Sequence, residues 1–301
     1  MELAQLRALR ELGDRGSIAA VAALLRVTPS SVSQQIAALQ RQSTLPLTQR
    51  MGRRTVLTDA GRALAEAAVD VEVALARATQ AVEEHRTART GHVAVAAFHS
   101  AGSAMFGALL RALDGPALPA VSLSDFDVAQ EEFPRLTAEH DLVIAHRLDG
   151  SPPWPRSLSV RPLLIEPLDI AVRRDHRLAS HTSIEPGDLD DEVWVAVHDG
   201  FPLAHALQTI TGISGSAPSV AHRVNDFRVA ADIVAASGSI ALMPRYMGLP
   251  PGATDIVLRP LSHPHLGRHI DSLARPETRT RTSVQIVDDE IGLAFERLAA
   301  G

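Results

Sequence analysis

Apolar residues recur at helical spacing near the N-terminus, which predicts a group of short helices. Leucine recurs every third residue from Leu3 to Leu12, and Gly13 and Gly16 then interrupt the pattern. A second apolar segment covers residues 18–25, with Ser17 as its predicted N-cap. The sequence therefore predicts two short helices separated by a turn that contains glycine.

The segment TPSSVSQQIAALQ, residues 28–40, predicts a third helix with a polar start. Thr28 is the predicted N-cap, and Pro29 suits the first helical position because its missing N–H would have no partner there. Val32 and Ile36 lie on one face, which leaves serine and glutamine side chains outside the core. Two short helices joined by a tight turn predict a helix-turn-helix unit, whose second helix lies in the major groove of DNA.

The next segment, LPLTQRMGRRTVLT, predicts a two-stranded wing. Val56 and Leu57 indicate extended chain, and Gly52 allows a turn with positive φ. Arginines at positions 50, 53 and 54 flank that turn, where guanidinium groups can reach DNA phosphates. A solvated arginine cluster is the alternative interpretation.

A long amphipathic helix is predicted over residues 59–88, with Thr58 as its cap. Its apolar positions alternate spacings of four and three, which is the heptad pattern of a helix that pairs with a copy of itself. The predicted seam comprises Leu64, Ala68, Val71, Leu75, Ala78 and Val82. At about 1.5 Å per residue the helix would form a rod of roughly 45 Å. A helix packed only against its own domain is the alternative.

From residue 91 onward, short apolar runs alternate with amphipathic segments, which predicts strands covered by helices. Strands or apolar runs lie at 92–98, 121–128, 141–146, 163–172, 193–197, 239–243 and 272–276, and helices at 102–113, 202–210, 226–237 and 283–299. This order predicts two α/β units with parallel sheets. Ligands of such sheets bind in a crevice beyond the carboxyl ends of the strands.

The distribution of charge and aromatic residues narrows the function. The first sixty residues hold eight arginines and four acidic residues, which gives them a net charge of +4. Because the whole chain has a net charge of −6, the remainder carries −10. No aromatic residue precedes Phe98, whereas proteins that bind single strands usually stack bases on aromatic rings. A basic N-terminal region without rings favours binding to double-stranded DNA.

Several other classes of protein are disfavoured by features that the sequence lacks. The chain has no cysteine, which excludes disulfides, thiolate nucleophiles and cysteine metal sites. It has no apolar run of about 18 residues and no secretory signal at its charged N-terminus, so we expect a cytoplasmic protein without a membrane partner. The GxSxG, P-loop, GxGxxG and HExxH motifs are absent, so we predict no catalytic residues, no cofactor and no enzyme activity.

At this point the N-terminal segment GSIAAVAALLRVTPSSVSQQIAALQ…LPLTQRMGRRTVLTDAG, residues 16–61, is informative as a whole. It combines a serine-containing start to the second helix, a P-S-x-V-S-x-Q-I start to the third, a P-L-x-x-R step and an R-x-x-x-L-T-x-x-G exit from the wing. In this order the motifs resemble those of LysR-type transcriptional regulators. DHRLA (175–179) and IVAASGSIALMP (233–244) are similar to the effector domain of that family. The chain departs from the family pattern at Thr44-Leu45, Thr48, Gln40 and Gln49, which bears on the packing between wing and third helix.

The resemblance implies an α/β protein with an N-terminal winged helix-turn-helix, a long linker helix and a C-terminal effector domain of two α/β subdomains, built like periplasmic solute-binding proteins. The implied domains are residues 1–58 for DNA binding, 59–90 for the linker and dimerisation helix, 91–163 plus 268–301 for effector subdomain I, and 164–267 for effector subdomain II. It also implies double-stranded promoter DNA, a small-molecule effector and further copies of the chain, as dimer or tetramer, as partners. RNA polymerase is a further candidate partner.

Carried onto this sequence, the resemblance places the DNA contacts on the second and third helices and the wing. The candidates are Ser17, Thr28, Pro29, Ser30, Ser31, Ser33, Gln34, Gln35, Arg50, Arg53, Arg54 and Thr55. We expect Ser33 and Gln34 to reach base edges, because glutamine pairs with adenine N6 and N7. We expect Ser30 and Ser31 to meet phosphate at the start of the helix.

Loops that follow predicted strands supply the candidate effector contacts. These are His99, Ser100, Ser103, Asp127, Val128, His146, Arg147, His198, Phe201 and Asn225. Arg147 could hold a carboxylate through two parallel hydrogen bonds, so an anionic or polar effector is the hypothesis. An ordinary surface arginine is the alternative.

The segment HPHLGRH, residues 263–269, has the composition of a metal site. His263, His265 and His269 could ligate zinc or nickel. Pro264 and Gly267 favour a solvated loop instead, so no metal is predicted. A solute-binding protein and, less favoured, an enzyme are the alternatives to a regulator, but the basic N-terminal region opposes the former.

Overall fold

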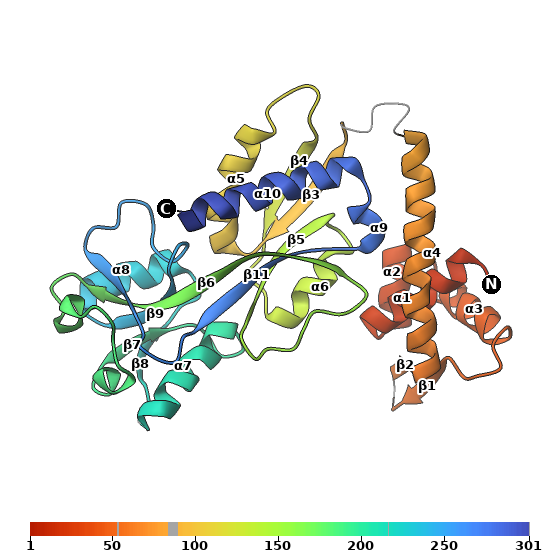
Figure 1. Cartoon of the computed structure of the whole chain (residues 1–301). Helices are drawn as coiled ribbons and strands as arrows, with labels where there is room; N and C mark the ends of the chain where they lie inside the picture. The colour runs from red at the N-terminus through yellow and green to blue at the C-terminus, as the bar shows by residue number, and fades with distance from the viewer. Residues whose placement is uncertain (53, 84–89, 216, 301) are drawn as a thin grey trace.

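The computed structural model describes residues 1–52, 54–83, 90–215 and 217–300. The N-terminal domain contains α1 (Leu3–Arg15), α2 (Ile18–Leu25), α3 (Pro29–Gln40), β1 (Thr48–Met51) and β2 (Arg54–Leu57), followed by the long helix α4 (Asp59–Glu83). Figure 1 shows these elements on one side of a larger α/β body, with the short helices grouped around the lower part of α4. No helix among the described residues is long and apolar enough to cross a membrane.

Local capping produces the helix-turn-helix as predicted. The Ser17 hydroxyl accepts a hydrogen bond from the Ala20 N–H, and the Thr28 hydroxyl accepts one from the Ser31 N–H at 3.1 Å. Between the two helices Arg26 has a φ of 52°, which ends α2 in the left-handed region and turns the chain sharply. The turn lets α2 and α3 bury their apolar faces in one core with α1.

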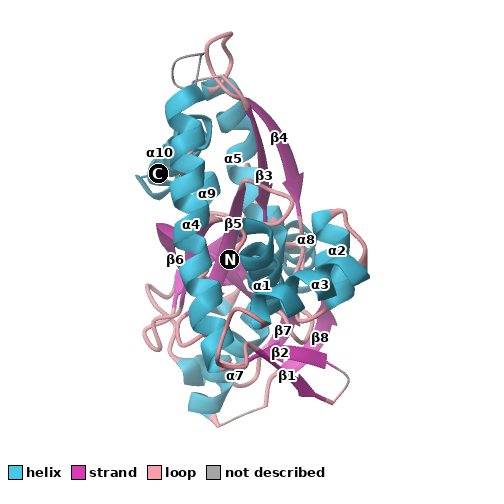
Figure 2. Ribbon diagram, turned by 90° about the vertical axis from the view of Figure 1, so that its right-hand side faces the viewer, coloured by secondary structure: helices cyan, strands magenta, loops and turns pink. Residues whose placement is uncertain are grey.

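The wing is attached to α3 by a glutamine side chain. The Gln40 amide donates to the Leu45 carbonyl at 3.0 Å and accepts from the Leu47 N–H at 2.8 Å. The departure from the family pattern at Gln40 therefore supplies two hydrogen bonds between the third helix and the segment that leads into the wing. Gly52 has a φ of 62° at the tip, as predicted. Figure 2 shows the β1–β2 hairpin projecting at one end of α4.

The start of α4 explains the T-x-x-G exit from the wing. Thr58 caps the helix by accepting from the Gly61 N–H at 3.0 Å, as predicted. A Cβ atom on Gly61 would lie 2.0 Å from the carbonyl oxygen of Leu47, so only glycine allows this close approach. The helix is described to Glu83, and the predicted residues beyond it up to residue 88 lie outside the described part.

The body contains one large mixed sheet with strand order β4-β3-β5-β11-β6-β9-β7-β8, and β10 pairs with β6. The strands are β3 (His92–Ala97), β4 (Ala120–Asp125), β5 (Leu142–Leu148), β6 (Ser159–Arg173), β7 (Val193–Ala196), β8 (Ser219–Arg223), β9 (Ile240–Pro244), β10 (Ile256–Pro260) and β11 (Gly267–Ala274). The helices are α5 (His99–Ala112), α6 (Phe133–Leu136), α7 (Pro202–Ser214), α8 (Phe227–Ser237), α9 (Pro276–Arg279) and α10 (Thr282–Ala300).

The prediction of purely parallel sheets was wrong at the centre. β3 is parallel to β4 and β5, and β7 is parallel to β8 and β9, but β11 runs antiparallel to both β5 and β6. The two long strands β6 and β11 connect the halves directly, so no helical crossover is needed between them. The strand predicted at 272–276 in fact begins at Gly267, and β8 and β10 were not predicted.

The first half of the body has one apolar core and the second half has two. One core joins β3, β5, α5 and α10, and the other two lie among β6, β7, β9, α7 and α8. The boundary predicted at residues 163 and 164 falls inside β6, and that at 267 and 268 falls at the first residues of β11. The domain limits therefore remain a prediction, since both connecting strands belong to both halves.

Candidate functional sites

Helix α3 has its apolar side buried and its polar side open. Val32, Ile36 and Leu39 are buried in the N-terminal core. Thr28, Pro29, Ser30, Ser33 and Gln34 are exposed, and Ser31 and Gln35 are partly buried. The Ser33 hydroxyl donates to the Pro29 carbonyl at 3.0 Å, so it offers acceptor lone pairs outward. The predicted DNA contacts on this helix thus form one accessible surface.

The wing places further predicted contacts beside a short turn. Arg50 and Arg54 are exposed on β1 and β2, and Thr55 faces Arg50 in the strand register. Arg53 lies outside the described residues. Ser17 is exposed at the start of α2. This arrangement brings cations and hydroxyls to the same domain as the polar side of α3.

Three of the eight N-terminal arginines, including Arg15 beside Glu11, form ion pairs within the protein. Arg7 pairs with Glu72 at 2.7 Å, and Arg10 is buried beside Glu72 and Glu277. Their charges are neutralised within the protein, so the counted charge of +4 overstates the charge that DNA meets. Exposed cations remain at Arg26 and in the wing.

The predicted self-association seam on α4 divides into two parts. Leu64 and Ala68 pack against the N-terminal core, and Ala68 is almost fully buried. Val71 and Leu75 are 46% and 49% exposed, and Ala78 is also exposed. The side chain of Val82 lies outside the described residues. The first part thus holds the helix to its own domain, because α1 covers it, and the rest is open.

A cavity of about 310 Å³ lies where the two halves of the body meet. It is lined by seven of the predicted effector residues: His99, Ser100, Ser103, Asp127, His146, Phe201 and Asn225. Most other lining residues are apolar, from Phe98 and Leu298 on one half to Phe227, Met247 and Leu249 on the other. A concave site with a few convergent polar groups has the character of a ligand site.

Three predicted effector residues are not among those that line the cavity. Val128 packs against the apolar core of the first half. Arg147, which alternates with His146 along β5, lies 3.4 Å from Asp271 and points away from the cavity. At His198 the backbone N–H donates to the Asn225 side chain. The structure therefore places the predicted carboxylate clamp on the wrong face of its strand.

The buried cation of the cavity is Arg268, which sequence reasoning missed. Arg268 and Glu166 are 1% and 0% exposed, and their side chains pair at 2.8 Å. Glu166 also accepts hydrogen bonds from the N–H groups of Tyr246 and Met247, and Arg268 donates to the Ser100 hydroxyl at 3.1 Å. The acid inside the apolar run LLIEPLDI was the signal that could have revealed the pair, because buried charges need partners.

Rings surround this ion pair. The guanidinium of Arg268 lies 4.9 Å from the ring centre of Phe98 and 5.8 Å from that of Phe227. His146 contacts the ring of Phe98 edge to face at 4.6 Å. Burial, and next the charge of Arg268, lower the pKa of His146 to about 3, so this ring is neutral at physiological pH.

Polar contacts cross the mouth of the cavity. Asn225 donates to Asp127 at 3.2 Å, and His99 lies 2.8 Å from Asp125 and 3.4 Å from Asp226. These contacts join the two halves beside the cavity. Asp127 and Asp226 add two negative charges to the lining and Arg228 adds one positive charge, whereas Arg268 is already neutralised by Glu166.

The candidate histidine ligands do not come together. His263 lies 3.3 Å from Glu185, His269 pairs with Asp149, and His265 is exposed. No group of three metal-ligating side chains occurs in the part of the chain that the structure describes. Residues 267–269 begin β11, so the predicted loop covers only the first part of this segment.

Two family models match the chain. Residues 3–62 match the bacterial regulatory helix-turn-helix proteins of the lysR family, and residues 86–287 match the LysR substrate binding domain. Among curated proteins, the regulator AbaB of Streptomyces antibioticus is 28% identical over 274 residues, covering 88% of this chain and 89% of its own length. The regulator GbpR of Rhizobium radiobacter is 27% identical over 213 residues, covering 69% of each chain.

Solved structures have the same fold. The LysR family regulator HinK of Pseudomonas aeruginosa matches with a TM-score of 0.58 at 16% identity, covering 99% of this chain and 98% of its own. CbnR in complex with its target DNA matches with a TM-score of 0.52 at 20% identity, covering 98% of this chain and 100% of its own. At these identities the likeness shows the fold alone.

Proposed function

This chain belongs to the LysR family of DNA-binding transcriptional regulators, and we propose that its helix α3 reads promoter sequence while its wing holds the DNA backbone. The observation that carries the proposal is the division of α3 into a buried apolar side and an exposed row of hydroxyls and amides. Ser33 and Gln34 are proposed to reach base edges, and Arg50 and Arg54 phosphates. Arg53 remains a predicted contact of the same kind.

Fluorescence anisotropy tests this division on a labelled duplex from the region upstream of the gene. Gln34→Ala should lower affinity for this duplex more than for a scrambled one, because it removes a base contact. Arg54→Ala should weaken both equally and reduce the slope of log affinity against log salt by roughly one. Gln208→Ala, an exposed glutamine on α7, is the matched control. Loss of preference with Arg54→Ala but not with Gln34→Ala would reverse the assignment.

We propose that the cavity between the halves binds the effector, and that this effector is largely apolar and carries no negative charge. Its rings and aliphatic side chains favour an apolar body. The buried cation Arg268 is already paired with Glu166, and the carboxylates of Asp127 and Asp226 outnumber Arg228, the other arginine of the lining, so the remaining charge would repel an anion. The earlier hypothesis of an anionic effector rested on Arg147, which lies elsewhere. Among the described residues the Ser100 hydroxyl is held by Arg268 and no hydrogen bond joins a serine of the cavity to a histidine, and we propose that the cavity binds its ligand without transforming it.

Phenylacetamide and phenylacetate provide a matched pair of probes. They share the same ring, but the amide group of the first is neutral and the carboxylate group of the second is negatively charged. In a thermal-shift titration we expect the amide to raise the unfolding midpoint more than the carboxylate at equal concentration. Ser103→Trp should abolish the difference by filling the cavity, and Arg111→Trp on the outer part of α5 should not. A larger shift of the unfolding midpoint with phenylacetate would contradict the proposal and favour an anionic effector.

Self-association is proposed to use the open part of α4, where Val71 and Leu75 lie exposed. Pairing two such helices would bury both faces and hold two α3 helices at a fixed spacing, as an inverted repeat in DNA requires. Whether dimers pair further into tetramers does not affect this step. RNA polymerase is proposed as a partner at the promoter, and the cytoplasm as the place of action.

A further inference from the structure

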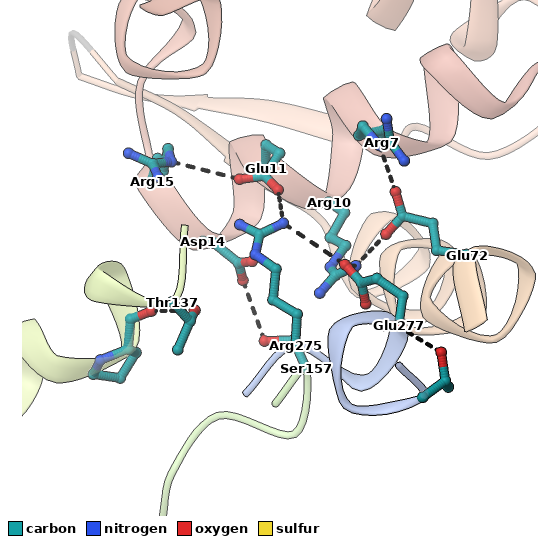
Figure 3. Close-up of polar contacts among 12 residues, drawn as sticks. Arg7, Arg10, Glu11, Asp14, Arg15, Glu72, Thr137, Ser157, Arg275 and Glu277 are labelled. Atoms are coloured by element: carbon teal, nitrogen blue, oxygen red, sulfur yellow. Dashed lines mark hydrogen bonds and ion pairs between the residues drawn. The ribbon is translucent and has the colours of Figure 1, made fainter. Parts of the chain in front are cut away.

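The N-terminal domain and the effector body are joined by a cluster of buried charges. Arg10 of α1 lies 3.0 Å from Glu277 of α9 and pairs with Glu72 of α4. Glu11, the next residue of α1, pairs with Arg275, which immediately precedes α9. Figure 3 shows these side chains converging from three separate segments of the chain. Five formal charges from α1, α4 and the start of α9 therefore meet at one contact.

Because its charges are buried, this contact has one defined geometry but carries a desolvation penalty. Arg10, Glu11 and Glu72 are each exposed by no more than 3%. Within the described residues, two nitrogens of Arg10 and one oxygen of Glu277 are buried without a hydrogen-bond partner. A partly satisfied buried network repays little of its desolvation penalty, although it fixes one geometry. The contact is thus suited to open and close more than to stabilise.

The contact leaves the DNA-reading surface open. Ser30, Ser33 and Gln34 are exposed while α1 is docked on α9, so docking does not cover α3. What docking fixes is the direction in which α3 and the wing are held relative to the effector body. In an assembly that reads two half-sites, this direction decides whether both α3 helices fit one duplex.

One strand connects this contact to the cavity. β11 begins beside Arg268, which lines the cavity, and ends immediately before Arg275. Seven residues of strand span about 23 Å. β11 is hydrogen-bonded to β5 on one side and to β6 on the other, with a register shift against β6 between Ile270 and Asp271, and it forms one continuous strand from the cavity to the α9 contact.

We propose that the docking of α1 on Arg275 and Glu277 is an intramolecular lock on the DNA-binding domain, and that β11 couples it to the occupant of the cavity. The lock itself stands on the charge cluster alone. Its coupling rests on the proposed effector function of the cavity. A ligand that displaces Arg268 breaks or rearranges the contact of α1 with Arg275 and Glu277. The orientation of the DNA-binding domain relative to the effector body then changes.

The full-length chain has no cysteine, so spin labels can be placed without a background. Thr44→Cys and Asp114→Cys put exposed labels on the N-terminal domain and the effector body. Double electron–electron resonance should give a narrow distance distribution for this pair. Arg275→Gln should shift and broaden it, whereas Arg281→Gln, whose partner Asp141 lies within the same half of the body, should not.

A second variant separates release from misfolding. Glu11→Gln combined with Arg275→Gln removes both charges of this pair and leaves only Arg15, which is 20% exposed, without its Glu11 partner. The N-terminal domain should therefore fold, and the distribution should still broaden. Retained binding of nonspecific duplex DNA verifies that fold. An unchanged distribution in both variants would overturn the lock.

The coupling is tested by the filled cavity. Ser103→Trp should shift the same distribution, and Arg111→Trp should leave it as in the parent. If Arg275→Gln releases the domain but Ser103→Trp has no effect, coupling through β11 is refuted and the lock remains. The DNA-binding and probe-binding assays measure the proposed function without using the distance distribution. A failure of the proposed function can therefore be distinguished from a failure of the lock.

Discussion

His146 makes the effector body sensitive to acid, and the size of the effect follows from its burial. The ring is neutral in the folded protein because burial and the charge of Arg268 lower its pKa to about 3 from an ordinary 6.5. In the unfolded chain the same ring takes up a proton near pH 6.5. The free energy of unfolding is therefore not reduced by this ring above pH 6.5, and it falls as the pH drops from 6.5 toward 3, because only the unfolded chain binds the proton in that range. Between pH 7.5 and 5 the loss is about 2 kcal/mol, a value that holds for any folded pKa well below 5.

His146→Gln removes the titrating ring and retains a neutral polar side chain. Urea denaturation followed by tryptophan fluorescence is suitable, because Trp154 lies in the same apolar core as the ring's neighbours. The variant should lose about 2 kcal/mol less than the parent between pH 7.5 and 5. His92→Gln, an exposed histidine on β3, should follow the parent.

Two results would refute the reasoning about His146. One is a pH profile of His146→Gln that runs parallel to the parent. The other is a proton NMR titration in which the His146 ring takes up its proton near pH 6.5. Either would mean that water reaches the ring and that the cavity wall is not closed around it.

Three further predictions concern the N-terminal domain and α4. Leu75→Glu should shift sedimentation toward the monomer, whereas Ile213→Glu, also at a site that is 49% exposed, should not; equal effects would place the interface elsewhere. Gly61→Ala should lower the free energy of unfolding by roughly 2 kcal/mol or more, since its Cβ would overlap the Leu47 carbonyl, and a midpoint unchanged in urea would contradict this. Arg26→Gly should raise the free energy of unfolding by about 0.5–1 kcal/mol, because glycine adopts the left-handed φ without strain; calorimetry showing a lower unfolding temperature would show that the arginine makes a stabilising contact.

The N-terminal domain was the most predictable part, because its signals are local. Caps at Ser17 and Thr28 act within three residues, and the turn at Gly52 within one hairpin. Most elements of the body were predicted, but β8, β10 and the arrangement of the sheet were not. β11 pairs with strands far away in sequence on both sides, and its start, Gly267 to His269, gave no local sign of a central strand.

The candidate site was predictable as a position but not as a set of side chains. Loops after strands do meet at a crevice, which is why most of the chosen residues line the cavity. Which of two neighbours on a strand faces inward depends on register. His146 faces the cavity and Arg147 faces Asp271, a difference that spacing alone could not decide.

The sequence by itself determined the class of the protein, the three N-terminal helices, the wing and the polar side of α3, because capping, helical spacing and turn residues act over a few positions. Only the tertiary structure decided what the charges do. Arg10 and Arg54 are alike in the sequence, yet the first is buried against Glu277, 267 residues away, and the second is open to solvent. Long-range pairing of this kind costs desolvation and is settled by which segments pack together, so composition could count the charges but not assign them.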